Sequence, residues 1–409
     1  MTTSCSLLTS GLGAAMPLAL DPYLRDWLDL LLRWLHVIAA IAWIGSSFYF
    51  VLLDQSLRPP ARDAAEHEGV AGELWEVHGG GFYHVRKYRV APSQLPDHLA
   101  WFKWEAYATW LSGFALLVVL YYAEASSTLV DPSVAGLEPW EGVAISIALL
   151  VVAWVVYDVL CRVLGAHDLW LAAAVAALTA LAAWASWELF APRAAWLQVG
   201  AMLGTIMAAN VFFVIIPAHW ELIRAKQAGR DPDAAPGIRG KQRSVHNNYL
   251  TLPVLLTMLA GHFAFLVGRS HAWLILVVLM AVGAAVRLFY NLRHAGRNLW
   301  AIPVGAAAVV VALAIALDPD DGGGEPATAA ELARGESVFA SAGCGGCHTL
   351  AAAGASGTVG PNLDGATPTR GRVEQIVATG QGVMPSFRSR LSEQEIAAVA
   401  AYVSSTAGQ

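Results

Sequence analysis

The sequence predicts an all-α protein in which a polytopic domain of eight membrane-spanning helices is followed by a small helical domain. Three observations lead to this fold class. Hydrophobic residues make up 56% of the 409 residues and charged residues only 14%, whereas ordinary soluble domains carry about 25% charged residues. Long apolar segments recur through most of the chain. A stretch rich in Gly, Pro and Asp then separates them from a less apolar tail.

Composition also excludes several classes of protein. The net charge of −6 argues against a surface that binds nucleic acid, and four cysteines are too few for a disulfide-stapled secreted scaffold. The sixteen tryptophans fit a membrane protein, because tryptophan is enriched at membrane–water interfaces. We therefore expect membrane lipid, and no nucleic acid, among the partners of this chain.

Eight segments are long and apolar enough to cross a bilayer, which takes about 20 residues in a helix. All should be helical, because a single apolar run in lipid can satisfy its own backbone hydrogen bonds only in this way. An N-terminal segment, residues 1–26, precedes them, and its first part lacks the basic region of a cleaved signal peptide. The membrane domain is expected over residues 27–317, with spans near 27–53, 105–123, 141–160, 169–189, 196–216, 249–268, 272–290 and 299–317.

The distribution of Arg and Lys predicts the orientation of the spans. Basic residues are concentrated in the loops after the first, third, fifth and seventh segments, whereas the other side carries only Arg25, Arg193 and Arg269. Basic loops stay on the cytoplasmic side of a membrane. Both termini are therefore expected outside the cytoplasm, which means the periplasm for the inner membrane of a Gram-negative bacterium.

The tail contains a motif for haem attachment. Residues 318–327 are expected to form a flexible linker, and residues 328–409 a separate domain with C-G-G-C-H from Cys344 to His348. Two thiols at this spacing can each form a thioether with one haem vinyl group, and the adjacent histidine can bind the iron. A zinc-binding pair and a disulfide are the alternatives, although two further zinc ligands are missing nearby.

Other features of the tail favour a covalently bound haem c on Cys344, Cys347 and His348. Met384 follows His348 by 36 residues and offers a thioether ligand for the opposite face of the iron. With Gly360-Pro361-Asn362-Leu363 between them, the tail resembles class I cytochrome c over nearly its whole length. Haem is attached to such domains outside the cytoplasmic membrane, in agreement with the charge distribution. The tail should pass electrons to a respiratory acceptor, either a terminal oxidase or a soluble cytochrome.

A second resemblance is carried by long stretches of the N-terminal part. These are WLHVIAAIAWIGSSFYF at 34–50, GELWEVHGGGFYHVRKY at 72–88 and WFKWEAYATWLSGFALL at 101–117. With eight spans and a C-terminal cytochrome, the whole chain resembles the membrane-bound urate hydroxylase family, also called the cytochrome c-type urate oxidases. The resemblance implies an oxidoreductase of purine degradation that oxidises its substrate urate to 5-hydroxyisourate. The tethered cytochrome, rather than oxygen, would be the direct electron acceptor.

A site for urate, a planar anion, needs cationic or N–H donors, a flat apolar wall and a proton acceptor. The segment after the first span supplies such residues, with His78, His84 and Lys87 as candidate catalytic residues around Gly79–Gly81. Glycine lets backbone N–H groups approach an anion closely. The alternative is a glycine turn between two amphipathic interfacial helices. Residues 246–248 (His-Asn-Asn) are interpreted as the polar start of the sixth helix rather than as part of the site.

Two histidines lie within the apolar segments, where ionisable groups are costly and usually functional. His36 and His262 are expected at similar depth in the outer half of the membrane. A non-covalent haem b held between them, with Arg33 near a propionate, is therefore a hypothesis. It would supply a second redox station, because urate loses two electrons and a c-type haem accepts one at a time. Each histidine could instead hydrogen-bond a neighbouring helix.

Two other functions stay open at this point. The chain could oxidise another small reductant, such as a quinol or a porphyrinogen. It could also be a non-catalytic electron-transfer anchor for a partner subunit that performs the oxidation.

Overall fold

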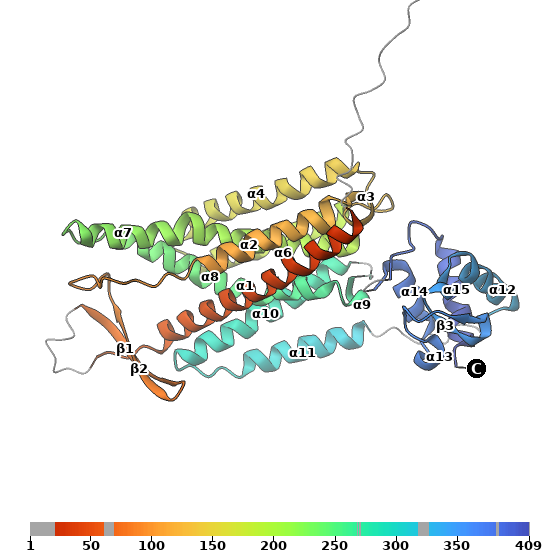
Figure 1. Cartoon of the computed structure of the whole chain (residues 1–409). Coiled ribbons are helices and arrows are strands. Elements are labelled where there is room, and N and C mark those ends of the chain that lie inside the picture. The colour runs from red at the N-terminus through yellow and green to blue at the C-terminus, as the bar shows by residue number, and fades with distance from the viewer. Residues whose placement is uncertain are drawn as a thin grey trace, which may run out of the picture.

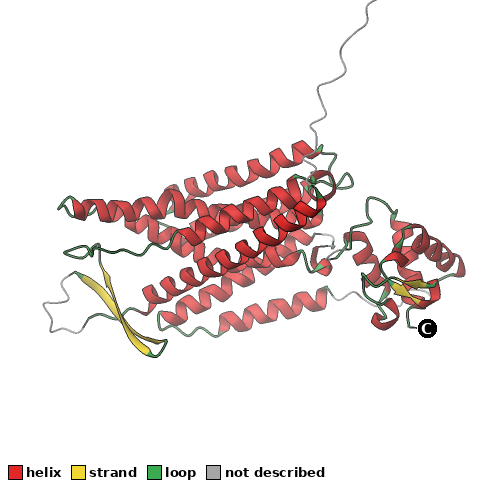
Figure 2. Cartoon of the chain, viewed as in Figure 1, coloured by secondary structure: helices red, strands yellow, loops and turns green. Residues whose placement is uncertain are grey.

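The computed structural model describes two helical parts, a long bundle and a small domain that lies at one end of it (Figure 1, Figure 2). The all-α fold with a C-terminal helical domain is confirmed. The predicted linker and most of the predicted N-terminal segment fall outside the residues that the structure describes, which are 21–60, 69–267, 269, 271–317, 327–381 and 384–408.

Each of the eight predicted spans corresponds to a helix of the bundle. Six helical segments of the described residues are long and apolar enough to cross a membrane. Neither α8, whose N-terminal half is polar, nor α11, which has 16 residues, is among these six. The bounds are α1 Pro22–Ser56, α2 Trp104–Leu117 with the π-helix η2 Val118–Tyr122, α3 Ala125–Thr128, α4 Pro139–Leu164, α5 Asp168–Leu189, α6 Pro192–Asn210, the π-helix η3 Val211–Ile215, α7 Ile216–Gln227, α8 Ala234–Ala260, α9 Ala264–Val267, α10 Ala272–His294 and α11 Ala301–Ala316.

The fifth span extends well past its predicted end at residue 216. α6 continues through η3 into α7, and together they form one segment of 36 residues. At 1.5 Å per residue this segment is about 54 Å long, whereas the hydrocarbon core of a bilayer is about 30 Å thick. The end of α7 therefore extends beyond the membrane core, at the end of the bundle away from the C-terminal domain (Figure 1).

The segment after α1 forms a β-hairpin, so the alternative of a glycine turn between two amphipathic interfacial helices is wrong. Strand β1 Val70–His78 pairs with β2 Gly81–Tyr88 in antiparallel register. Gly79 and Gly80 connect them with φ angles of 58° and 81°. A two-residue hairpin turn needs positive φ at both positions, which glycine adopts without strain. The glycine run thus makes a tight turn between strands.

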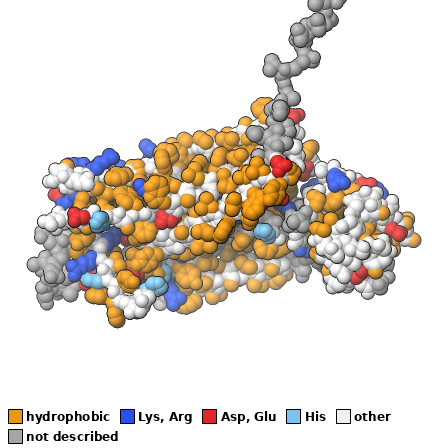
Figure 3. Space-filling model, in the orientation of Figure 1, with side chains coloured by type: hydrophobic (Ala, Val, Ile, Leu, Met, Phe, Trp, Pro, Cys, Tyr) orange, Lys and Arg blue, Asp and Glu red, His pale blue; other side chains and the backbone are white. Residues whose placement is uncertain are grey.

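α6 is the most buried helix of the bundle, and the outer helices present an apolar surface. α6 packs against α4, α5 and α8. In the continuous helical segment Pro192–Gln227, which contains α6, 56% of the most apolar stretch is buried, against 17–33% in the other five candidate spans. Figure 3 shows an apolar band along the bundle with charged side chains gathered towards the two ends. Such an exposed band fits a protein that is surrounded by lipid.

The C-terminal domain has its own hydrophobic core. α12 crosses α15, with the rings of Phe339 and Tyr402 6.0 Å apart, and Leu350 and Val399 are buried beside them. α14 contacts α9, which lies in the chain between the end of α8 and the start of α10. The elements are α12 Ala329–Ser341, η4 Cys344–Gly346, β3 Thr349–Leu350, η5 Ala351–Ala353, β4 Ala355–Ser356, α13 Leu363–Ala366, α14 Arg370–Thr379 and α15 Glu393–Thr406.

Candidate functional site

The predicted haem-attachment motif lies on a short 3₁₀ turn directly after α12. Gly343 reverses the chain with a φ of 76°, and the turn then spans Cys344–Gly346. Cys344 and Cys347 are both free thiols. Cys347 is exposed, whereas Cys344 is half-buried and burial raises the pKa of its thiol. Two unpaired thiols at this spacing fit attachment to a haem better than the alternative of a disulfide.

His348 is held in an orientation that suits iron binding. Its Nδ1 lies 2.9 Å from the Pro361 carbonyl oxygen, so Nδ1 donates and Nε2 keeps its lone pair. Its ring lies against Gly360, where a Cβ atom would be 2.5 Å from Cε1 of the imidazole. Only glycine leaves room for the ring at this position. Orienting a ligand histidine through a backbone carbonyl on its other nitrogen is a common arrangement in metal sites.

Met384 belongs to the same domain core, and its role as the second iron ligand stays a prediction. The residue forms an isolated bridge with Gln381 and packs partly buried against the hydrophobic core. Gly380, with a φ of 68°, turns the chain just before it. The domain thus places the Met384 thioether against the same hydrophobic core that Cys344 contacts.

The two histidines of the proposed haem b occupy different environments. His36 faces α2, where its Nδ1 lies 2.9 Å from the Thr109 carbonyl oxygen and its ring lies against Gly113. His262, by contrast, is exposed in the turn after α8, which ends at Ala260. Its predicted location well inside a span is therefore wrong, because the helix ends two residues earlier. Arg33 donates to Asp29 one turn before it, at 2.6 Å.

The hairpin does not bring the three candidate catalytic residues together. Side chains alternate between the two faces of a strand, so His84 lies on one face while His78 and Lys87 lie on the other. In the register His78 is opposite Gly81, six residues from Lys87, which is about 20 Å along a strand. The catalytic role of these residues stays a prediction that this geometry does not favour.

Two of these three side chains are already engaged by carboxylates. His84 Nε2 lies 2.9 Å from Glu73 Oε2, and its ring stacks on Trp75 with the centroids 4.2 Å apart. Lys87 forms an ion pair with Asp54 of α1. Paired cations offer less attraction to an anion such as urate.

A buried polar network links α4, α6 and α8, and residues predicted as a polar helix start belong to it. α8 begins at Ala234, so His246 and Asn247 lie in its middle. His246 Nδ1 lies 2.8 Å from the Tyr157 hydroxyl. Asn210 donates to that hydroxyl at 3.1 Å and to the Asn247 side chain at 2.9 Å. Buried polar groups in a membrane bundle are costly and mark functional positions.

One ion pair of this network is almost fully buried. Arg243 of α8 donates to Asp158 of α4 at 2.7 Å, and the two side chains are 5% and 10% exposed. Arg162, one turn further along α4, donates to the other oxygen of the same carboxylate at 2.6 Å. The guanidinium of Arg243 also lies over the Tyr157 ring, 4.9 Å from its centroid. Nη1 of Arg243 is buried without a hydrogen-bond partner among the described residues.

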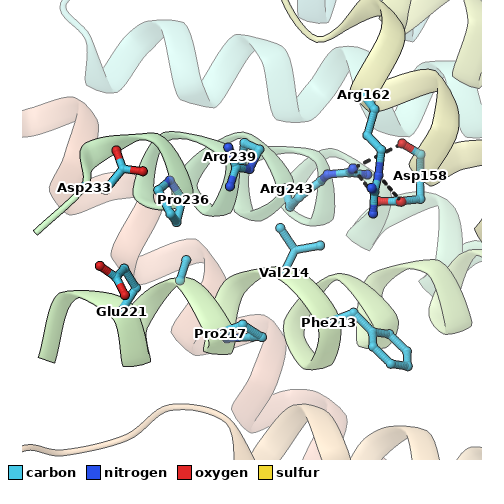
Figure 4. A pocket seen from close by; sticks show the side chains of 11 residues that line it. Asp158, Arg162, Phe213, Val214, Pro217, Glu221, Asp233, Pro236, Arg239 and Arg243 are labelled. Carbon is cyan, nitrogen blue, oxygen red and sulfur yellow. Dashed lines mark hydrogen bonds and ion pairs between the residues drawn. The ribbon is translucent and has the colours of Figure 1, made fainter. Parts of the chain in front are cut away.

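A cavity of about 630 Å³ opens beside this ion pair, at the end of the bundle away from the C-terminal domain (Figure 4, Figure 1). Ligand pockets typically measure about 300–1,000 Å³. One wall carries charged side chains from α4 and α8, and the facing wall is mostly apolar and comes from η3 and α7. The lining residues are Asp158, Arg162, Phe213, Val214, Pro217, Ala218, Glu221, Asp233, Pro236, Arg239 and Arg243.

A second buried cluster, also missed from the sequence, joins α1, α8 and α10. Arg287 donates to the side-chain oxygens of Asn248 and Asn291, at 2.9 and 3.0 Å. Its guanidinium lies 3.9 Å from the centroid of the Phe48 ring. No carboxylate pairs with it among the described residues, and amide oxygens share its charge instead.

Comparison with known proteins assigns both parts of the chain. Residues 22–318 match the family described as urate oxidase N-terminal. The chain belongs to this family. In this member of the urate oxidase N-terminal family, residues 330–403 also match a domain described as cytochrome C oxidase, cbb3-type, subunit III. The predicted family resemblance is confirmed.

Known cytochromes are similar to the C-terminal part. Cytochrome c6 of Picosynechococcus sp. is 39% identical over 95 residues, which cover 20% of this chain and 80% of that protein. The crystal structure of the c-type cytochrome SorU from Sinorhizobium meliloti is 45% identical and covers 20% of this chain and 97% of its own, with a TM-score of 0.20. A cytochrome c domain implies a covalently bound haem c, and the geometry of Cys344, Cys347 and His348 fits one. The protein is therefore a urate-related redox enzyme with an electron-transfer domain.

Proposed function

We propose that this protein hydroxylates urate to 5-hydroxyisourate in purine degradation and passes the electrons to its own haem c. One observation carries the proposal: a single chain joins a urate oxidase N-terminal domain to a cytochrome domain with an oriented iron-ligand histidine. Urate and water give 5-hydroxyisourate, two protons and two electrons. The haem c accepts one electron at a time, so two transfers complete each turnover.

The proposed location is the inner membrane of a bacterium, with both termini and the cytochrome domain in the periplasm. Basic loop residues, which stay on the cytoplasmic side, support this orientation. The charged cavity and the cytochrome domain lie at opposite ends of the bundle (Figure 1). The reduced haem would then pass its electrons to a terminal oxidase or to a soluble cytochrome.

A haem b in the bundle remains part of the proposal, with His36 as its better supported ligand. The hydrogen bond from Nδ1 to the Thr109 carbonyl leaves Nε2 with a free lone pair, as neutral imidazole requires for binding iron. His262 would need a position other than its exposed turn to ligate the same group. A pyridine haemochrome spectrum before and after acid–acetone extraction tests this point, since it counts covalent and extractable haem separately. One covalent haem per chain and no extractable haem would exclude haem b.

The urate reaction itself is tested by adding urate to the purified, oxidised protein without oxygen. We expect the absorbance of reduced haem c to appear with formation of 5-hydroxyisourate, at two reduced haems per product. A protein that stays oxidised with urate but is reduced by a quinol would instead be a dehydrogenase of another reductant. A protein that stays oxidised until a partner subunit is added would be an electron-transfer anchor.

A further inference from the structure

The cavity between α4, α8 and the η3–α7 segment has the chemistry of a site for a planar anion. We infer that it is the urate-binding site, with Arg239 and Arg243 as donors to the anion. This inference rests on the proposed function and adds the location of the substrate.

The charged wall has donors that the protein itself does not use. Arg243 is held by Asp158 through Nη2, and its buried Nη1 has no partner among the described residues. Arg239, which lies one helical turn before Arg243 on α8, is exposed, lines the cavity and pairs with no carboxylate in the described part of the chain. Figure 4 shows both side chains along α8 on one side of the cavity. A ligand with several acceptor oxygens and nitrogens can satisfy them together.

The carboxylates of the lining are committed to other groups. Asp158 accepts from Arg162 and Arg243, and Glu221 pairs with Arg230 at 2.8 Å. Asp233 accepts from the backbone N–H of Ala235 at the start of α8. The three lining arginines and Arg230 carry four positive charges, and these three carboxylates carry three negative charges, so the local net charge is one positive charge. A monoanion such as urate would neutralise this net charge.

The opposite wall suits a flat ring. Phe213 and Val214 belong to the π-helix η3, and Pro217 and Ala218 continue the same wall into α7. A π-helix widens one turn of a helix and is frequent at functional sites. A planar ligand lying against this apolar wall keeps its edge towards the arginines of α8. The volume of about 630 Å³ admits a purine-sized ligand with water beside it.

The buried network behind the cavity fixes the position of Arg243. Its guanidinium is held between the Asp158 carboxylate and the Tyr157 ring, and Tyr157 is fixed in turn by His246 and Asn210. A donor that is fixed before the substrate arrives loses little freedom on binding. Tyr157 and His246 are thus positioning residues in this arrangement.

The deciding experiment measures haem reduction against urate concentration in purified wild-type protein and in Arg239→Gln. Because Arg239 is exposed, its replacement should leave the fold intact, and an unchanged unfolding transition by tryptophan fluorescence checks this for the membrane domain. Reduction of haem c by ascorbate checks that the cytochrome domain is intact. Loss of one charge-assisted hydrogen bond should raise the KM for urate roughly tenfold to a hundredfold. Arg224→Gln is the matched control, since Arg224 lies over the Trp220 ring on α7 outside the cavity lining. Its KM should equal that of the wild type.

Competition experiments distinguish a site for a planar purine from a general anion site. Xanthine, a planar oxopurine, should inhibit urate-driven reduction in the wild type and lose potency in Arg239→Gln. Inorganic phosphate and vesicles with phosphatidylglycerol should inhibit far less. Equal inhibition by phosphate or by the anionic lipid would overturn the inference in favour of a general anion site. If urate reduces the wild-type haem while Arg239→Gln keeps an unchanged KM, the site lies elsewhere. If urate fails to reduce wild-type haem at all, the proposed function fails first, and this inference with it.

Discussion

Replacing Asp158 by Asn should destabilise the membrane domain strongly, because it removes the only carboxylate that the structure pairs with Arg243 among the described residues. The two side chains are 5% and 10% exposed and 2.7 Å apart. Breaking a buried pair from one side typically costs about 3–5 kcal/mol, since the other charge stays buried. The second partner, Arg162, is 74% exposed, so its loss adds only about 0–1 kcal/mol. We therefore expect a total loss of about 3–6 kcal/mol in the free energy of unfolding.

The assay is reversible unfolding of the purified protein in mixed micelles of rising SDS content, followed by tryptophan fluorescence. Haem absorbance follows the cytochrome domain separately. Glu124→Gln is the control, because it breaks the partly exposed Arg25–Glu124 pair. Loss of this pair should lower the free energy of unfolding by at most about 1 kcal/mol. The double variant Asp158→Leu/Arg243→Met removes both charges and should recover most of the loss.

A loss below about 1 kcal/mol for Asp158→Asn would refute the reasoning. It would mean that Arg243 reaches water through the cavity and does not depend on its carboxylate. A double variant that is no more stable than Asp158→Asn would show that the effect comes from packing rather than from charge.

Three further predictions concern the cytochrome domain and the orientation. The double variant Cys344→Ala/Cys347→Ala should abolish haem staining on a denaturing gel, because both thioether links are lost, while the membrane domain keeps its unfolding transition; undiminished staining would contradict the attachment site. Met384→Leu should lower the reduction potential of haem c and remove any methionine–iron absorption in the red, whereas an unchanged spectrum would point to another ligand. A periplasm-specific reporter should be active at the C-terminus and silent when inserted near Gln227, and the reverse pattern would invert the proposed orientation.

The spans and the haem motif could be predicted because local rules decide them. In lipid an apolar run of sufficient length has to be a helix, and all eight runs correspond to helices. To form a haem-attachment site, the C-G-G-C-H motif needs only a turn that holds the cysteines and a nearby loop that orients the histidine. The Gly360–Pro361 stretch supplies that loop, since it packs against His348 and accepts its hydrogen bond.

The hairpin was missed although the sequence held a signal for it. Two glycines between runs rich in Trp, Val, Phe and Tyr are typical of a two-residue hairpin turn. The depth of His262 could not be predicted from hydropathy, because apolar residues continue past Ala260 although the helix does not.

The buried network could not be read from one sequence. Arg243, His246 and Asn247 lie one turn apart on α8 and therefore share a face. The partners of Arg243 and His246 are Asp158 and Tyr157, more than eighty positions away on α4. The partner of Asn247 is Asn210, on α6. Nothing local indicates which helices meet, so these residues resemble an ordinary polar helix start. Only the packing of α8 against α6 and its neighbours brings them together.

The separation of the two sites makes the electron path the central physical question for this enzyme. The cavity and the cytochrome domain lie at opposite ends of the bundle (Figure 1), so under the proposed function electrons would have to cross a membrane core about 30 Å thick. His36 lies 14 residues into α1, about 21 Å from its outer end. A redox group bound there would divide the crossing into two shorter steps. If urate binds in the cavity as inferred above, the substrate stays away from the haem. Under that proposal the bundle would conduct electrons towards the cytochrome domain, while the protons released by hydroxylation would leave at the cavity end.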